Sequence, residues 1–218
     1  ARTGARIDAV AAEIRSSDGR AWPVPCDVTD PASVRNLVEQ GARFIGDVDI
    51  LVNNAGAGHS APVHRITLED WNHVLAVNAT GTLLCTQAFL PDMLARRRGA
   101  IVNVASVAGL AGARYIAAYS AAKHAVIGFT RSVAAEVAGT GVTCNAVCPG
   151  YVDTEMTQES VARVVAKTGK PPDEALHAML AASGQQRLIT PEEVAAAVLA
   201  LCDSEQPRNG EAIVLHGL

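Results

Sequence analysis

The chain has 218 residues, of which 49% are hydrophobic and 18% are charged, so it is long and apolar enough to fold around a sizeable core and is not a disordered tail. Its formal net charge is −4 and only 4% of its residues are aromatic, which argues against a nucleic-acid-binding surface of basic and base-stacking side chains. No apolar run approaches the roughly 18 residues of a membrane span, so we expect no membrane partner.

The chain carries five cysteines, an odd number, and has neither a Cys-x-x-Cys pair nor a His-Glu-x-x-His motif. Because stable disulfide frameworks need cysteines in pairs and an oxidising compartment, we expect reduced thiols in a cytoplasmic protein. Zinc sites need closely spaced Cys and His ligands, so we expect no bound metal. The cysteines are Cys26, Cys85, Cys144, Cys148 and Cys202.

Helical and strand-like patterns alternate along the chain, which is typical of an α/β fold whose parallel sheet is covered by helices. The first half is predicted to contain a helix over 3–17, a short strand over 21–25, a helix that begins at Asp30-Pro31, a buried strand over 48–52, and a helical region over 67–98 that Pro91 kinks or divides. The second half is predicted to contain strands over 100–105, 142–147 and 211–215, with helices over 119–138, in pieces over 157–182, and over 190–202.

Four polar or turn-forming motifs follow four of the predicted strands. They are Asp27-Val28, Asn53-Asn54-Ala55-Gly56, Ser106, and Pro149-Gly150-Tyr151-Val152-Asp153-Thr154. Each motif by itself is also typical of an ordinary turn that reverses the chain. In an open parallel sheet, ligands bind outside the carboxyl ends of the strands. Four such motifs at one sheet edge therefore predict one continuous cleft.

A tyrosine and a lysine four residues apart, Tyr119 and Lys123, share one face of a predicted helix. A nearby ammonium group favours the phenolate, and lowering the pKa of a tyrosine by about three units requires about 4 kcal/mol. The spacing alone is a weak indication, because it also occurs by chance on helix surfaces. Ser106 lies at a strand end, where a serine can donate a hydrogen bond to a carbonyl while the tyrosine donates the proton.

Together these motifs resemble those of the short-chain dehydrogenase/reductase family, in its classical branch, over essentially the whole chain. The resemblance rests on the order and spacing of Asp27-Val28, Asn53 to Gly56, Asn78, Ser106, Tyr119-x-x-x-Lys123 and Pro149-Gly150. It implies an α/β fold with a single doubly wound parallel sheet of the Rossmann type and helices on both faces. Residues 1–218 would then form one catalytic domain that lacks the first β-α unit of the family.

The resemblance implies catalytic roles for four residues. Tyr119 would be the general acid in reduction and the base in oxidation, and Ser106 would polarise the substrate carbonyl. Lys123 would hydrogen-bond the nicotinamide ribose and lower the pKa of Tyr119. Asn78 would hold a water molecule that links Lys123 to solvent as a proton relay.

The resemblance also implies a dinucleotide cofactor bound along the predicted cleft. Asp27 and Val28 would contact the adenine. The side of the adenosine ribose would be lined by Asn53, Ala55 and Gly56. The residues implied for the nicotinamide end are Tyr119, Lys123, Pro149, Gly150, Val152 and Thr154, of which the last two would hold the carboxamide.

Arg2 bears on the choice between NAD and NADP. Members of the family often carry an acidic residue after the second strand that binds the ribose 2′-hydroxyl of NAD, whereas the matching region here reads Ala1-Arg2-Thr3. An arginine suits the 2′-phosphate of NADP through charge-assisted hydrogen bonds, although a solvated arginine at a chain end is the plain alternative. We therefore expect NADP(H) as the cofactor, with NAD(H) as the alternative.

The sequence departs from the family pattern at its start. The glycine-rich turn that binds pyrophosphate is absent, as are the first strand, the first helix and nearly all of the second strand. Because the family's strand order is 3-2-1-4-5-6-7, the absent first strand is a central one. We therefore expect roughly 30–45 further residues upstream, about one β-α-β half-unit, without which pyrophosphate binding and activity would fail.

The surroundings of Tyr119 and the segment Cys148-Pro149-Gly150-Tyr151 are similar to those of polyketide and 3-oxoacyl-thioester ketoreductases. Residues 155–186 match the family's variable substrate lid and are rich in apolar side chains here. The resemblance thus implies NADP(H)-dependent reduction of a small-molecule ketone, a 3-oxoacyl or polyketide-like carbonyl, to a secondary alcohol. The helices over 70–97 and 119–138 are the family's usual dimer faces, which implies a homotetramer or homodimer.

Three other functions stay open at this point. The first is an NAD-dependent alcohol or hydroxyacyl dehydrogenase of the same family. The second is a catalytically silent dinucleotide-binding protein, which would be free to lose Tyr119. The third is a lyase or epimerase on the same scaffold, which usually departs from the pattern at Asn53 to Gly56.

Overall fold

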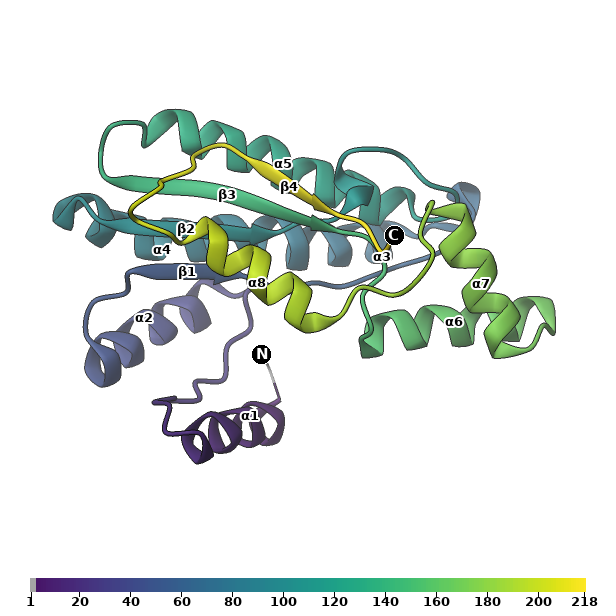
Figure 1. The fold of residues 1–218 in the computed structure, drawn as a ribbon, viewed down its shortest axis with the longest axis horizontal. Coiled ribbons are helices and arrows are strands. Elements are labelled where there is room, and N and C mark those ends of the chain that lie inside the picture. The colour runs from purple at the N-terminus through teal and green to yellow at the C-terminus, as the bar shows by residue number, and fades with distance from the viewer. Residues whose placement is uncertain (1–2) are drawn as a thin grey trace.

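Four strands form a fully parallel sheet in the spatial order β1-β2-β3-β4 in the computed structural model, which describes residues 3–218 (Figure 1). The strands span Ile50–Asn53 (β1), Gly99–Val104 (β2), Val142–Pro149 (β3) and Ala212–Leu215 (β4). β3 lies inside the sheet and is almost wholly buried, as is usual for a strand covered on both faces. The predicted α/β class and the four later strands are therefore confirmed.

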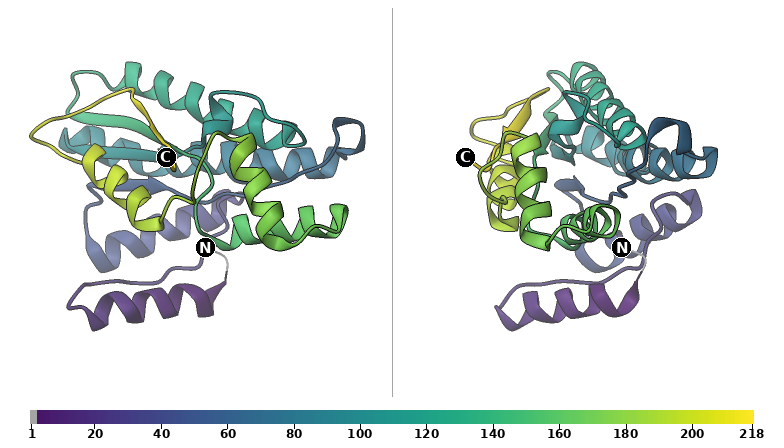
Figure 2. Two further views of the ribbon diagram at one scale, coloured as in Figure 1. Left: turned by 45° about the vertical axis from the view of Figure 1, so that its right-hand side comes forward. Right: turned by 90° about the vertical axis from the view of Figure 1, so that its right-hand side faces the viewer.

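Helices cover both faces of the sheet (Figure 2). On one face, α4 (Gly81–Arg96) packs on β1 and β2, α5 (Ala117–Glu136) packs on β3, and α2 (Pro31–Ile45) packs on α4. On the other face, α8 (Pro191–Leu201) packs on β2 and β3. This is the doubly wound arrangement that the sequence predicts.

The alternation of side chains along β2 produces these two layers. Ile101 belongs to one buried cluster with Phe89 and Met93 of α4. Its neighbour Val102 points to the opposite face, where it packs with Leu201 of α8. Each face of the sheet thus has its own apolar core.

Two helices begin where their capping residues predict. The Asp30 side chain accepts a hydrogen bond from the Ala32 amide, with Pro31 at the first position of α2. At α8, Thr190 and Glu193 form a reciprocal capping box, in which each side chain bonds the backbone amide of the other residue.

The predicted strand over 21–25 is wrong, because these residues adopt no regular secondary structure. A strand is stable only beside a neighbour, and no described strand pairs with this segment. Instead, Trp22 stacks on Phe44 of α2, with ring centroids 6.4 Å apart. The helix before it, α1 (Gly4–Ser16), buries only Ala11 and lies apart from the sheet in Figures 1 and 2.

Pro91 does not divide the long helical region, contrary to one half of the prediction made for it. Pro91 lies inside α4, and the division falls earlier, at a π-helical turn over Ala76–Thr80 between α3 (Leu68–Leu75) and α4. At this turn, side chains donate hydrogen bonds to backbone carbonyls: Asn78 Nδ2 donates to Val74 O (2.8 Å) and Thr82 Oγ1 donates to Asn78 O (2.7 Å). The widened turn is therefore stabilised by the residues that form it.

Among the described residues, one helical run, Leu68–Arg96, is long and apolar enough by length and composition alone to cross a membrane. A single run of this kind is a weak indication, because core helices of soluble proteins meet the same condition. Here the run contains α3 and α4, and α4 packs on β1, β2 and α2. We therefore interpret the run Leu68–Arg96 as helices that pack within the fold and not as a membrane span.

The remaining elements lie around the carboxyl edge of the sheet. They are 3-10 turns over Val63–Arg65 and Val107–Gly109, and two helices, α6 (Glu155–Thr168) and α7 (Pro172–Ala182), which project beyond that edge in Figure 1. The predicted interruption over 169–172 is confirmed: Gly169 adopts the left-handed conformation that ends α6.

Replacing Gly109 by Ala is expected to destabilise the fold by about 1–3 kcal/mol. A Cβ at this position would lie 2.7 Å from the carbonyl oxygen of Lys123, a backbone atom of α5 that has little room to move. Gly112→Ala is the matched control, since its Cβ would meet nothing within 4 Å. Denaturant unfolding measures both variants, and equal stabilities would contradict the close packing of this turn on α5.

Candidate active site

The structure brings the predicted strand-end motifs to one edge of the sheet. Asn53 ends β1, Ser106 follows β2, and Pro149 ends β3. All three strands run parallel, so these residues lie at neighbouring carboxyl ends. α5 crosses the same edge and carries Tyr119 and Lys123 into it.

Ser106 and Tyr119 form a hydrogen-bonded pair. The Ser106 oxygen also accepts a bond from the Ala108 amide (3.1 Å), and its hydroxyl donates to the Pro149 carbonyl (3.3 Å). These contacts fix the serine oxygen at the end of β2. Its single proton is donated to the Pro149 carbonyl, and Tyr119 lies within hydrogen-bonding reach of the same hydroxyl group.

Lys123 is buried, with 5% of its surface exposed. Its ammonium group donates to the Val104 carbonyl at the end of β2 (2.8 Å) and lies 5.6 Å from the centre of the Tyr119 ring. Burial lowers the pKa of Lys123 to about 8, a shift that Cys148 opposes. The predicted juxtaposition of Tyr119 and Lys123 on one helix face is present.

The expected lowering of the Tyr119 pKa by Lys123 is not found. Burial raises the pKa of Tyr119; its hydrogen bond with Ser106 opposes that shift, and nearby Tyr151 adds to it. The Lys123 ammonium group faces the tyrosine ring and the Val104 carbonyl, which leaves burial as the dominant influence. Tyr119 is therefore held as a neutral phenol that has a proton to donate.

Asn78 joins the same cluster through the π-helical turn. Its amide nitrogen donates to the carbonyls of Val74 and Ala57, both at 2.8 Å. Within residues 3–218, its buried Oδ1 atom has no hydrogen-bond partner. A Cβ on Gly56 would lie 3.2 Å from this Oδ1 and 3.8 Å from Lys123 Nζ. Gly56, Asn78 and Lys123 thus line one small polar recess.

Asn53 lies differently from the expectation. Its side chain turns into the core, where Nδ2 donates to Asn103 Oδ1 (2.8 Å) and Thr86 Oγ1 (3.2 Å). Asn103 in turn donates to Thr130 of α5 (2.8 Å). The Asn53 side chain therefore anchors the strand end to two helices, while the following residues 54–56 are exposed at the edge.

The Asp27-Val28 segment also reaches this region. The Asp27 carboxylate accepts bonds from the Thr29 amide (3.0 Å) and hydroxyl (2.7 Å). Val28 packs against the first residue of α4, since a Cβ on Gly81 would lie 2.7 Å from a Val28 methyl carbon. The predicted cofactor residue Arg2 lies outside the described residues.

The segment after β3 is held by a residue that the sequence analysis missed. Gln185 is buried, its Oε1 accepts from the Tyr151 amide (2.7 Å), and its Nε2 donates to the Tyr151 carbonyl (3.2 Å). Further along, Val152 pairs with Ile189 in an isolated bridge, and Thr154 is exposed. A glutamine in a variable lid has no sequence signature, and only its burial reveals it.

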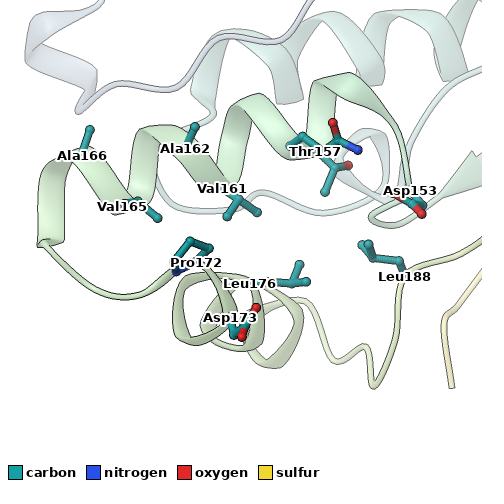
Figure 3. A pocket seen from close by; sticks show the side chains of 11 residues that line it. Asp153, Thr157, Val161, Ala162, Val165, Ala166, Pro172, Asp173, Leu176 and Leu188 are labelled. Atoms are coloured by element: carbon teal, nitrogen blue, oxygen red, sulfur yellow. The ribbon is translucent and has the colours of Figure 1, made fainter.

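A cavity of about 530 Å³ opens between α6 and α7, within the predicted lid (Figure 3). Val161 and Val165 of α6 face Pro172 and Leu176 of α7 across it, and Asp153 lies at one end. Neither Ser106, Tyr119 nor Lys123 lines this cavity. The described residues contain no cluster of three or more His, Cys, Asp or Glu side chains able to hold a metal ion.

Comparison with known proteins identifies the family. A profile of the short chain dehydrogenases matches residues 1–164. An inactive 2-(S)-hydroxypropyl-CoM dehydrogenase 2 of Xanthobacter autotrophicus is 43% identical over 206 residues, which cover 94% of this chain and 85% of that protein. A 3-oxoacyl-(acyl-carrier-protein) reductase of Thermotoga maritima is 35% identical over 212 residues, covering 97% and 82%.

A second 3-oxoacyl-(acyl-carrier-protein) reductase, from Synechocystis, is 44% identical over 158 residues, which cover 72% of this chain and 64% of that protein. The profile matches well over half of the chain, and the residues it covers carry the Ser106, Tyr119 and Lys123 cluster. This chain therefore belongs to the short-chain dehydrogenase family, oxidoreductases that use a nicotinamide dinucleotide.

Proposed function

We propose that this protein is an NADP(H)-dependent ketoreductase that converts a 3-oxoacyl or polyketide-like ketone to a secondary alcohol. The observation that carries the proposal is the cluster at the carboxyl edge of the sheet, where Ser106 and Tyr119 share a hydrogen bond and Lys123 lies against the tyrosine ring. A serine hydroxyl beside a neutral tyrosine phenol is suited to binding and protonating a carbonyl oxygen. We propose the chain as one catalytic domain.

The residues at this edge fit a dinucleotide. Asn78 Oδ1 is buried without a partner among the described residues, and Gly56 leaves open the space where a Cβ would approach it. Residues 54–56 and Thr154 are exposed on either side of the cluster. Asp27, Val28, Ala55 and Gly56 would hold the adenosine end, and Asn53 would fix the end of β1, from which residues 55 and 56 follow.

The nicotinamide end would be held by Tyr119 and Lys123 together with the segment after β3, that is Pro149, Gly150, Val152 and Thr154. When bound, the cofactor supplies a hydride to the carbonyl carbon. Tyr119 gives its phenolic proton to the carbonyl oxygen, which completes the alcohol. Ser106 donates its hydrogen bond to the same oxygen and so stabilises the negative charge that develops there.

Lys123 and Asn78 would return a proton to Tyr119. With a pKa near 8, the Lys123 ammonium group can release and regain a proton close to neutral pH. The unpartnered Asn78 Oδ1 lies in the same recess and can accept a hydrogen bond from a water molecule. This gives the buried phenol a route to solvent.

The proposed substrate class follows from the relatives and the lid. Two relatives are named as 3-oxoacyl-(acyl-carrier-protein) reductases and a third as a putative ketoacyl reductase of granaticin polyketide synthesis. The lid helices α6 and α7 carry apolar side chains, among them Val161, Val165 and Leu176, although the cavity between them does not reach Ser106 or Tyr119. Both features favour a carbonyl compound with hydrophobic bulk.

A catalytically silent dinucleotide-binding protein is the second candidate, because one relative at 43% identity is named as an inactive dehydrogenase. The presence of Asn78, Ser106, Tyr119 and Lys123 in one cluster favours an active enzyme. The full-length chain, offered NADPH and a panel of 3-oxoacyl thioesters, should consume NADPH in proportion to the alcohol formed. Cofactor binding without turnover across the panel would establish the silent alternative.

Replacing Arg2 by Asp is expected to shift the cofactor preference toward NADH by at least about tenfold in kcat/KM. A guanidinium group paired with the 2′-phosphate contributes roughly 1.5–3 kcal/mol, and an aspartate there repels that phosphate. Steady-state kinetics with NADPH and NADH measure the ratio in both proteins. An unchanged ratio would remove the argument for NADP(H) and leave NAD(H).

We further propose a cytoplasmic homotetramer or homodimer assembled through α4 and α5. Of the alanines on α5, Ala118 and Ala122 are buried beside Val74 of α3 and so serve packing within the chain. The outward face of α5 exposes small residues, among them Ala125 and Gly128, which permit close approach of a second copy.

A further inference from the structure

Gln185 makes contacts that no other side chain in the lid region makes among the described residues. It is 5% exposed, although it lies three residues beyond the end of α7. Its side-chain amide bonds both backbone groups of Tyr151, at 2.7 Å and 3.2 Å, and the Tyr151 carbonyl accepts a further bond from the Ile189 amide (3.0 Å). Nε2 also donates to the Arg187 carbonyl (3.3 Å), and Oε1 accepts from the Ser183 hydroxyl (3.1 Å).

The glycine before Tyr151 allows this contact. A Cβ on Gly150 would lie 2.6 Å from Gln185 Cδ, so any larger residue would push the amide away. Gly150 is held from a second side as well, because its amide donates to the Leu215 carbonyl of β4 (3.2 Å). The backbone over residues 149–151 is thus held by β4, by the Ile189 amide and by the Gln185 side chain.

The backbone over residues 149–151 also contains the Pro149 carbonyl, which accepts the hydrogen bond of the Ser106 hydroxyl. Ser106 Oγ donates to the Pro149 carbonyl (3.3 Å), and the same hydroxyl group is bonded to Tyr119. Moving the Pro149 carbonyl would therefore redirect the Ser106 proton. The next residues along the chain are Val152 and Thr154, which we assign to the nicotinamide end.

We propose that Gln185 is a positioning residue for the reduction: it fixes the backbone after β3 and thereby orients the Ser106 hydroxyl and the nicotinamide-binding segment. This inference rests on the proposed function. Gln185 reaches the site only through the Tyr151 backbone and has no hydrogen bond with Ser106 or Tyr119 of its own. Its effect should therefore appear in the chemical step rather than in substrate binding.

The test variant is Gln185→Met, which keeps the length of the side chain and loses all four of its hydrogen bonds, including the two to Tyr151. We expect kcat to fall at least about tenfold while KM for the ketone stays within about threefold, because a displaced hydroxyl acts in the transition state. Hydrogen exchange at the Tyr151 amide, which loses its acceptor, should accelerate. Gln206→Met, at an exposed glutamine before β4, is the control and should change none of these quantities.

Gln185→Glu is the second variant and carries the test if the methionine variant does not fold. An ionised carboxylate still accepts from the Tyr151 amide but donates nothing to the Tyr151 carbonyl, so kcat should lie between those of the wild type and the methionine variant. A kcat within about twofold of wild type together with accelerated Tyr151 exchange would overturn the positioning role. A wild-type protein that reduces no ketone would overturn the proposed function itself, before any variant is compared.

Discussion

Tyr119→Phe is expected to lower kcat for ketone reduction by at least about 100-fold while leaving the fold and cofactor binding intact. A positioned general acid contributes about 10²–10⁴-fold to rate, and Tyr119 is the neutral phenol at the centre of the cluster. The phenylalanine ring preserves the packing against Val74 and Ala122. Steady-state turnover, with NADPH binding followed by fluorescence, separates the two effects.

The matched control is Tyr115→Phe, which removes a phenolic hydroxyl from an exposed tyrosine in the turn that precedes α5. Its turnover should stay within about twofold of wild type. If Tyr119→Phe kept near-normal turnover, Ser106 or solvent would have to supply the proton, and the role given to Tyr119 would be wrong.

Lys123→Met is expected to abolish most turnover and to stabilise the fold. A lysine whose pKa falls from 10.5 to about 8 on folding costs about 3 kcal/mol of stability at pH 7. Removing the ammonium group also leaves the Val104 carbonyl without this partner, which costs about 1–2 kcal/mol. The free energy of unfolding should therefore rise by about 1–2 kcal/mol at pH 7.

The pH dependence of this gain has a definite sign. Between about pH 8 and pH 10.5 the unfolded chain binds a proton that the folded Lys123 does not, so the stability of the wild type rises with pH. The advantage of Lys123→Met should therefore shrink as the pH approaches 10. Denaturant unfolding at pH 7 and about pH 10 measures it, with Lys167→Met at an exposed lysine of α6 as the control for charge alone.

A Lys123→Met variant less stable than wild type at pH 7 would contradict the burial of a charge at this position. A stability difference that stays constant with pH would show that Lys123 titrates alike in the folded and unfolded chains. Either result would also remove the proton route through the recess beside Asn78.

The later strands were predictable because strands covered on both faces are mostly apolar, as in segment 142–147, which forms β3 and in which only Thr143 and Asn145 are polar. Segment 21–25 has a similar local pattern and forms no strand, since strand formation depends on a neighbour that local sequence does not specify. Pro91 does not divide the long helix. The actual break depends on the Asn78 and Thr82 side chains, which bond carbonyls within their own turn.

The cluster of Ser106, Tyr119 and Lys123 was predictable because strand ends and helix spacing determine where side chains meet. The direction of the Tyr119 pKa was not, because it depends on burial and on where the Lys123 ammonium group points. Asn53 illustrates the same limit. Its place at a strand end is evident in the sequence, whereas its inward bond to Asn103 depends on which face of the sheet the side chain takes.

The most direct test of the proposed reduction uses deuterium to trace the hydride that the cofactor transfers. The full-length chain is incubated with a 3-oxoacyl thioester and NADPH deuterated at the transferring position of its ring, and the product is analysed by mass spectrometry. We expect a 3-hydroxy product that carries one deuterium at the former carbonyl carbon and disappears with Tyr119→Phe. A product without deuterium at that carbon, or cofactor binding with no product from any member of the panel, would contradict the proposed reduction.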